Sequence, residues 1–311
     1  MDANTHNAGY WRQLRNRMRI HAGLYLMLLP SVICLVVFWL LPLYGIQIAF
    51  REFDVKKGFF GSNWVGLKHF IRFFKSYNFF RTIRNTLAIN VYGLVTGFPL
   101  TICLAVMFQT SRAKKLSSVA QIISYAPAFL STVVVAGMIV TFFSQNYGLV
   151  NSIIVALGGD AKDFMGDPGA FWHIYTWSGI WQNIGFSTIM YMGAMSTISN
   201  ELYEAATMDG AGLWSKIWHI TLPGIKFIIA INLLLSLGNM LSMGFEKIFL
   251  LQNDMNLESS EVIATYVYKA GLIGGQFSYT TAIGLFNTAV NMLFLWNANR
   301  LCRKYFEYSI W

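Results

Sequence analysis

Six long apolar stretches constrain the fold of this 311-residue chain more than any other feature. A helix needs about 20 apolar residues to cross the ~30 Å hydrocarbon core of a bilayer. Charged residues make up only 12% of the chain, against about 25% in a typical soluble domain. We therefore expect an all-α polytopic membrane protein with six transmembrane helices. The predicted spans are Ala22–Phe50, Thr82–Phe108, Val119–Phe143, Phe171–Ile198, Ile225–Leu251 and Tyr279–Asn297.

Basic residues cluster beside these stretches and account for much of the net charge of +9. The positive-inside rule places such clusters in the cytoplasm, which predicts a cytoplasmic arm 1–21, a transmembrane domain 22–298 and a C-terminal tail 299–311. The stretch 51–81 is an exception to this rule, because it would lie outside although it is rich in lysine and arginine. Its interleaved aromatic and basic residues indicate an amphipathic segment at the membrane interface. Charges at membrane exits do not fit a nucleic-acid-binding patch. The three cytoplasmic clusters are Arg12, Arg15, Arg17 and Arg19; Arg112, Lys114 and Lys115; and Arg300, Arg303 and Lys304.

The sequence lacks the usual catalytic motifs. It has no Gly-Lys dipeptide and hence no P-loop, and it has no HExxH or GxSxG motif. The five histidines and three cysteines are dispersed, without the spacing of a metal site. We therefore predict no catalytic residue, no metal site and no cofactor bound by this chain. If the protein moves a solute uphill, the energy must come from another subunit.

The polar loop 199–224 is the most informative segment. It reads as a short helix, a glycine turn and a second short helix. Asn200 is a good N-cap residue, and Glu201 favours the positive end of the first helix. Asp209, Gly210 and Gly212 allow a tight turn with positive φ. Pro223 is expected to end the second helix and set the start of the fifth span.

The same loop contains Glu-Ala-Ala, three residues, Gly, nine residues, and then Ile-x-Leu-Pro. This pattern resembles the EAA loop of binding-protein-dependent ABC importer permeases, and every fixed position is met. Other segments, including PLYGIQIAFREFD (42–54) and YTWSGIWQNIGFS (175–187), resemble the polysaccharide and multi-sugar branch of carbohydrate permeases, which is related to the larger maltose-transporter permease. The predicted ATPase-coupling residues are Glu204, Ala205, Ala206, Asp209, Gly210, Ile220, Leu222 and Pro223.

The resemblance implies the type I ABC importer permease fold, in the bacterial cytoplasmic membrane with both termini inside. It implies import of an oligosaccharide together with a second homologous permease, two ATPase subunits and an extracellular solute-binding protein. ATP and Mg would bind the ATPase subunits. In such families the EAA loop docks into a cleft on the ATPase, where Glu204 is expected to pair with a basic residue.

Polar and aromatic side chains in the fourth and fifth predicted spans are candidates for the sugar pathway, because a membrane helix tolerates polar groups only where they meet protein or water. By the resemblance, the 182–186 window falls where maltose-type permeases contact sugar; interhelical packing is the alternative. Polar residues of the fifth span recur every three to four positions, which indicates a pathway wall or a contact with the partner permease. The candidates are Trp181, Gln182, Asn183, Phe186, Asn232, Ser236 and Asn239.

Glu246 and Lys247, near the outer end of the fifth span, are interpreted as charges that snorkel to the interface. An outer polar mouth is the alternative. Two other functions also stay open from the sequence: a stand-alone carrier or channel, and a membrane-embedded transferase. Neither needs a loop that docks an ATPase, whereas the permease does.

Overall fold

The computed structural model describes residues 21–306 and divides the chain into two units, 1–68 and 69–311. The predicted arm, apart from residue 21, and the last five residues of the predicted tail lie outside the described residues. The elements of the first unit are α2 Ala22–Leu35, η1 Val36–Leu40, α3 Leu41–Leu43, η2 Tyr44–Phe50, β1 Arg51–Glu52, α4 Gly58–Gly61 and β2 Asn63–Trp64.

The first unit is dominated by the helical run 22–50. A π-helical turn, η1, ends two residues before Pro42. The proline nitrogen carries no N–H, so it cannot make the regular helical hydrogen bond at this point. None of the 14 residues of α2 is buried. The run ends at a two-stranded antiparallel hairpin, in which Arg51 pairs with Trp64.

Helices are the only regular secondary structure of the second unit within the described residues. Its longest helices are α6, α10 and α18, of 34, 28 and 30 residues. Its elements are α5 Lys68–Phe74, which begins at the boundary, α6 Tyr77–Thr110, α7 Lys114–Tyr125, η3 Ala126–Phe129, α8 Thr132–Phe142, α9 Leu149–Ala156, α10 Pro168–Met195, α11 Asn200–Met208, α12 Leu213–Lys216, η4 Ile217–Thr221, α13 Leu222–Gly224, α14 Lys226–Gly238, α15 Phe245–Leu251, α16 Leu257–Ser260, α17 Ile263–Tyr268, η5 Lys269–Ile273 and α18 Phe277–Phe306.

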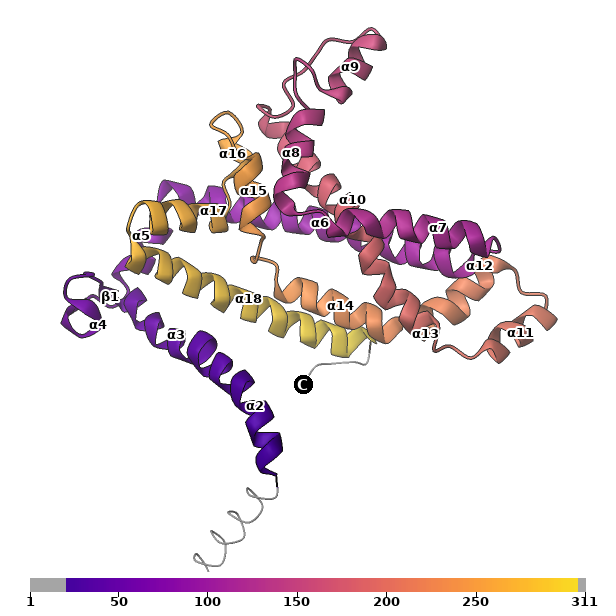
Figure 1. Cartoon of the computed structure of the whole chain (residues 1–311), viewed down its shortest axis with the longest axis horizontal. Coiled ribbons are helices and arrows are strands. Elements are labelled where there is room, and N and C mark those ends of the chain that lie inside the picture. Colours follow the sequence, from indigo (N-terminus) through magenta and orange to yellow (C-terminus); the bar gives the residue numbers. More distant parts are fainter. Residues whose placement is uncertain (1–20, 307–311) are drawn as a thin grey trace, which may run out of the picture. The chain divides into compact units, whose positions relative to one another are not determined.

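Two pairs of long helices organise this unit. Helix α10 packs along α6, and α14 packs along α18 (Figure 1). Gly93 and Gly97 of α6 form the close contact with α10: a Cβ at Gly97 would lie 3.3 Å from the Ile180 side chain. The small residues of this GxxxG spacing therefore allow the two helices to approach closely.

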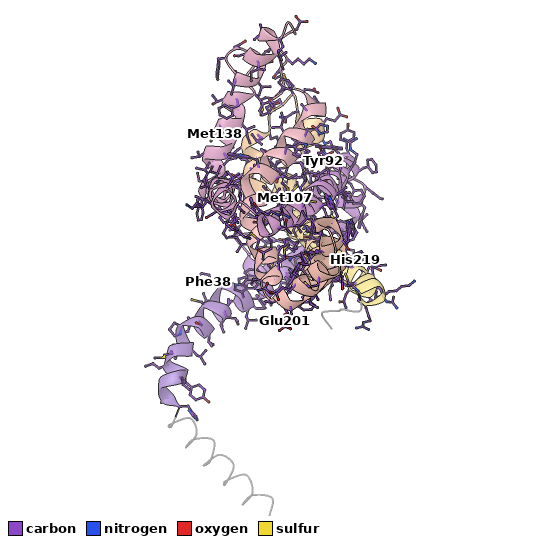
Figure 2. All side chains as sticks on the ribbon, turned by 90° about the vertical axis from the view of Figure 1, so that its right-hand side faces the viewer. Phe38, Tyr92, Met107, Met138, Glu201 and His219 are labelled. Atoms are coloured by element: carbon purple, nitrogen blue, oxygen red, sulfur yellow. The ribbon has the colours of Figure 1, made fainter. Side chains whose placement is uncertain are left out.

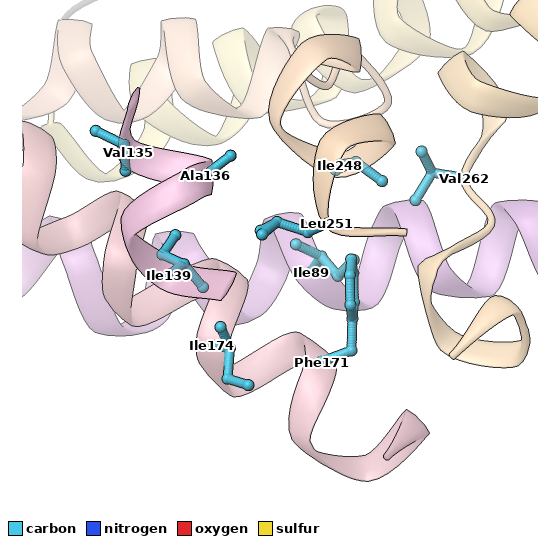
Figure 3. Packing of buried hydrophobic residues seen from close by; sticks show 9 residues of the cluster. All are labelled: Ile89, Val135, Ala136, Ile139, Phe171, Ile174, Ile248, Leu251 and Val262. Atoms are coloured by element: carbon cyan, nitrogen blue, oxygen red, sulfur yellow. The ribbon is translucent and has the colours of Figure 1, made fainter. Parts of the chain in front are cut away.

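Three buried clusters lock the shorter segments onto these helices. The first joins α6, α8, α10 and α15 (Figure 3) and comprises Ile89, Val135, Ala136, Ile139, Phe171, Ile174, Ile248, Leu251 and Val262. In the second, Ile217 and Ile225 pack against the ends of α6 and α10. In the third, Phe73 of α5 packs against Tyr279 and Phe286 of α18. Residues 69–74 of the predicted interfacial segment are thus partly buried in protein.

The predicted apolar stretches are all helical but differ in continuity. The helices 22–50 and α6 are long and apolar enough to cross a membrane, and the number rises to four if two bent pairs each count as one span. The third stretch bends by 100° between η3 and α8. The fifth stretch, expected to be continuous to Leu251, is interrupted between Gly238 and Phe245. By length and composition, residues 21–306 therefore contain two to four helical segments that could cross a membrane.

Side chains satisfy the backbone at both interruptions. The Gln182 amide donates to the carbonyl of Leu130 at the bend of the third stretch, at 3.2 Å. Asn291 of α18 accepts from the Leu241 N–H and donates to the Ser242 hydroxyl, both at 2.8 Å. A broken helix is tolerated in a membrane protein only where such partners replace the lost helical bonds.

Candidate functional site

The first helix of the 199–224 loop is an exposed projection. None of the nine residues of α11 is buried; Glu204, Ala205 and Asp209 are exposed and Ala206 is half-buried. The N-cap is Ser199, whose hydroxyl accepts from the Glu201 N–H at 3.3 Å. Asn200, the predicted N-cap, is instead the first helical residue. The chain presents the Glu-Ala-Ala face with little of it covered by its own side chains.

The end of α11 is fixed by Gly210. Its φ of +76° confirms the predicted left-handed turn at this residue, whereas Asp209 and Gly212 have φ values of −75° and −71°. The N–H of Gly210 donates to the carbonyl of Thr207 at 3.1 Å, and the N–H of Ala211 donates to that of Ala206 at 2.8 Å. These two bonds form a Schellman motif, in which the left-handed residue is usually glycine. The turn thereby sets the direction of the chain leaving α11.

Two side-chain hydrogen bonds tie α11 to the second half of the loop. The hydroxyls of Tyr203 and Thr221 lie 3.0 Å apart. The Lys216 ammonium donates to the Thr207 hydroxyl at 2.7 Å. Thr221 is 1% exposed, so this bond joins the exposed helix to a buried position.

The second half of the loop is anchored in the unit. Ile217 is buried, Ile220 and Leu222 are half-buried, and Leu213 is exposed. Pro223 does not end the helix as predicted, because the π-helical bond from the Leu222 N–H to the Ile217 carbonyl places the proline in a new first turn. The helical run 213–224 then meets α14 at a 62° bend.

Figure 1 shows α11 and the α12–α13 run at one end of the second unit, opposite α5 and α17. Figure 2, which looks toward this end, labels Glu201 and His219 of the loop. The loop connects directly to α14 and, through Ile217, packs against α6 and α10. A movement of α11 would therefore be passed to the helices that form the centre of the unit.

A cavity of about 880 Å³ lies between α6, α10 and the α14–α15 segment. This volume is within the ~300–1,000 Å³ range of small-molecule sites. Six of the seven pathway candidates line it: Gln182, Asn183, Phe186, Asn232, Ser236 and Asn239. Trp181 does not; it borders a second, apolar pocket with residues of α8.

The lining side chains differ in how firmly they are held. Gln182 is 9% exposed and is engaged by the Leu130 carbonyl, so it serves packing as well as the cavity wall. The Asn183 amide donates only within its own helix, to the Gly179 carbonyl at 3.1 Å. Asn232, Ser236 and Asn239 bond to carbonyls of their own helix, and the Asn232 amide also donates to the Met190 sulfur of α10 at 3.8 Å. Their remaining acceptor capacity is open to a ligand.

Two further lining residues bear on the chemistry of the cavity: Lys247, for which the sequence left an outer polar mouth as the alternative, and Thr176, which the sequence did not single out. Lys247 is 8% exposed, which corrects its interpretation as a snorkelling charge; Glu246 is the exposed member of the pair. The Thr176 hydroxyl is buried and has no hydrogen-bond partner within residues 21–304. Lys247 follows Asn239 by eight residues across the break after α14, and this interruption hid its place on the polar stripe.

Comparison with known proteins gives one family. Residues 97–303 match the model of the binding-protein-dependent transport system inner membrane component. The polygalacturonan/rhamnogalacturonan transport system permease protein YteP of Bacillus subtilis (strain 168) is 42% identical over 288 residues, 93% of this chain and 90% of the relative. Protein LplB of the same organism is 36% identical, over 91% of this chain and 89% of its own length.

The comparison with solved structures also finds a transporter chain. A chain of a bacterial alginate ABC transporter, crystallised with an alginate pentasaccharide-bound periplasmic protein, superposes with a TM-score of 0.88. It is 37% identical, and the superposition covers 96% of this chain and 100% of that one.

Proposed function

Because this chain belongs to the family of inner membrane components of binding-protein-dependent transport systems, we propose that it is one permease subunit of an ATP-driven importer of oligosaccharides. Its partners are a second, similar permease, two ATPase subunits and an extracellular solute-binding protein. ATP and Mg bind the ATPase subunits, and this chain carries no catalysis. Family membership decides against the stand-alone carrier and the membrane-embedded transferase.

The connection between the exposed loop and the cavity carries this proposal. Helix α11 is exposed and hydrogen-bonded to the buried Thr221. The run through Thr221 continues into α14, whose Asn232 and Ser236 line the cavity. In our proposal α11 docks on the ATPase, with Glu204 paired to a basic residue. Closure of the ATPase dimer then moves α11 and, through it, the wall of the cavity.

The two states of the transporter must differ in affinity for ATP and for the sugar, since a ligand shifts a conformational equilibrium only by such a difference. The tether at Thr221 and the buried Ile217 give α11 little freedom to move alone. ATPase closure therefore favours one arrangement of α14 against α6 and α10. The cavity opens to the outside in one arrangement and to the cytoplasm in the other.

For the membrane topology, we propose the type I importer fold with six spans in the domain 22–298. The broken third and fifth stretches each count as one span, and α10 and α18 supply the fourth and sixth despite their polar residues. The 109–118 loop lies at the same end of the second unit as the 199–224 loop, and α18, packed along α14, runs toward that end (Figure 1). All three carry basic residues, which supports cytoplasmic termini.

A mild-detergent pull-down of the tagged chain tests the proposal, with mass spectrometry of the bound proteins. We expect an ATPase and a second permease with wild type, and less ATPase with Glu204→Lys. Asp160→Lys, the same charge reversal at an exposed position outside the loop, is the matched control. A chain recovered alone from membranes that contain all subunits would refute the proposal.

A further inference from the structure

We propose that Lys247 binds a carboxylate of the sugar, so that this importer takes acidic oligosaccharides built from uronic acids. The inference rests on the proposed function, since it takes the cavity as the sugar pathway. It adds the substrate class and one specificity-determining residue. The argument starts from the surroundings of a single ammonium group.

The Lys247 side chain is buried without a matching anion. Within residues 21–304, no Asp or Glu carboxylate lies within 4.0 Å of its ammonium nitrogen. One long hydrogen bond reaches the carbonyl of Tyr175, at 3.4 Å, and the ring centroid of Tyr175 lies 5.1 Å away. An ammonium has three donor hydrogens, so most of its hydrogen-bonding capacity is unused. A buried charge of this kind is costly unless an anion meets it.

The ammonium lies at the cavity wall. Lys247 is the only charged residue among the described residues that line the cavity, so the wall has one positive charge and no negative one. Gly179 lies across from it: a Cβ there would be 3.6 Å from the ammonium nitrogen. The absence of a side chain at Gly179 leaves that side of the nitrogen open.

Neighbouring groups suit the rest of a sugar. Thr176 lines the same cavity and is 5% exposed, and its hydroxyl oxygen is buried with no hydrogen-bond partner within residues 21–304. Asn183 has its carbonyl oxygen available beyond its bond to Gly179. Hydroxyl and amide groups exchange hydrogen bonds with sugar hydroxyls, whereas the ammonium makes its strongest hydrogen bond to an acceptor that is itself charged, such as a carboxylate. The lining therefore favours a ligand with both hydroxyls and a carboxylate.

The position of Lys247 along the cavity indicates at which point of transport the sugar meets the ammonium. The cavity follows α10 from Tyr175 to Tyr191, and Lys247 contacts its Tyr175 end. In the proposed topology α10 begins outside, so this end faces the arriving sugar. The ammonium meets the ligand before Asn232, which lies near Met190 further along α10. Lys247 thus selects acidic sugars at the outer entrance of the cavity.

Binding to the assembled importer in nanodiscs, without the solute-binding protein, tests the inference directly. The probes are trigalacturonate and trimannuronate, each beside its neutral methyl ester. Lys247→Gln should weaken binding of an acid probe about tenfold or more, the usual effect of one lost charge-assisted bond, and leave its ester unchanged. Lys247→Arg should retain most of the affinity. Lys162→Gln, at an exposed position outside the cavity, is the control and should change neither.

Three results would overturn the inference. Equal weakening of acid and ester would assign Lys247 to packing. Loss of the second permease from Lys247→Gln would assign it to an ion pair between subunits. Wild type that binds neither acid probe but imports a neutral oligosaccharide with ATP would remove the acidic substrate while leaving the proposed function intact. Failure of the proposed function is distinct, since it would show as no ATP-driven uptake of any oligosaccharide.

Discussion

The hydroxyl of Tyr203, on the exposed helix α11, lies 3.0 Å from that of Thr221, which is buried at the end of η4, five residues before α14. The two bonded residues are 18 positions apart in the sequence. The bond ties the exposed helix to η4, the segment that leads into α14. The proposed coupling from ATPase to cavity passes through this contact.

Removal of the Tyr203 hydroxyl should weaken coupling without unfolding the protein. Tyr203→Phe deletes one hydrogen bond, worth about 1 kcal/mol. We expect less sugar imported per ATP hydrolysed in proteoliposomes, with normal assembly. Tyr147→Phe, at a tyrosine 71% exposed, is the control. An unchanged ratio for Tyr203→Phe would show that the contact does not transmit the movement.

The turn after α11 should tolerate only residues that accept a left-handed backbone. Gly210→Ala puts a Cβ at φ +76° and should cost about 1–2 kcal/mol. Hydrogen exchange should rise over residues 201–211, and ATPase association should fall. Gly212→Ala is the matched control, since Gly212 has φ −71° and no neighbour within 4 Å of an added Cβ. Equal effects of the two substitutions would contradict the role of the turn.

Two adjacent cavity residues should respond differently to truncation. Gln182→Ala leaves the Leu130 carbonyl without its partner and should lower stability by about 1–3 kcal/mol. Asn183→Ala removes only a bond within α10, so it should lower sugar uptake at an unchanged melting temperature in detergent. Normal uptake by Asn183→Ala would remove this residue from the pathway.

The contact between α10 and α7 should be intolerant of any side chain. A Cβ at Gly185 would clash with the backbone carbonyl of Ser124, whereas a Cβ at Gly193 of the same helix has no neighbour within 4 Å. Gly185→Ala should therefore destabilise the protein by about 1–3 kcal/mol, and Gly193→Ala should not. Melting curves in detergent compare them. Equal melting temperatures would show that the two helices can separate at little cost.

The sequence predicts the helical segments well because apolar length is a local property. It places helices over 22–50 and within α6, and it identifies the turn at Gly210, where one residue decides the backbone. It does not predict the bend at Leu130 or the break before Ser242. Those interruptions depend on Gln182 and Asn291, which lie about 50 residues away in sequence and whose partners are visible only in the folded chain.

For the candidate site too, the sequence predicts what depends on local spacing and does not predict what depends on the folded chain. The polar spacing of Asn232, Ser236 and Asn239 selects residues that do line one cavity. Trp181 has the expected residue type but lies toward the second pocket, because one helical position rotates a side chain by about 100°. Lys247 lies beyond the break, where helical periodicity no longer applies. Its burial had no signal in the sequence.

ATP-driven uptake by the reconstituted importer tests the central claim most directly. The complex of this chain with its second permease, the ATPases and the binding protein is placed in proteoliposomes with oligosaccharide outside and ATP inside. We predict accumulation that requires ATP and is abolished by Glu204→Lys but kept by Asp160→Lys. Accumulation without ATP, or at the wild-type rate with Glu204→Lys, would contradict the account.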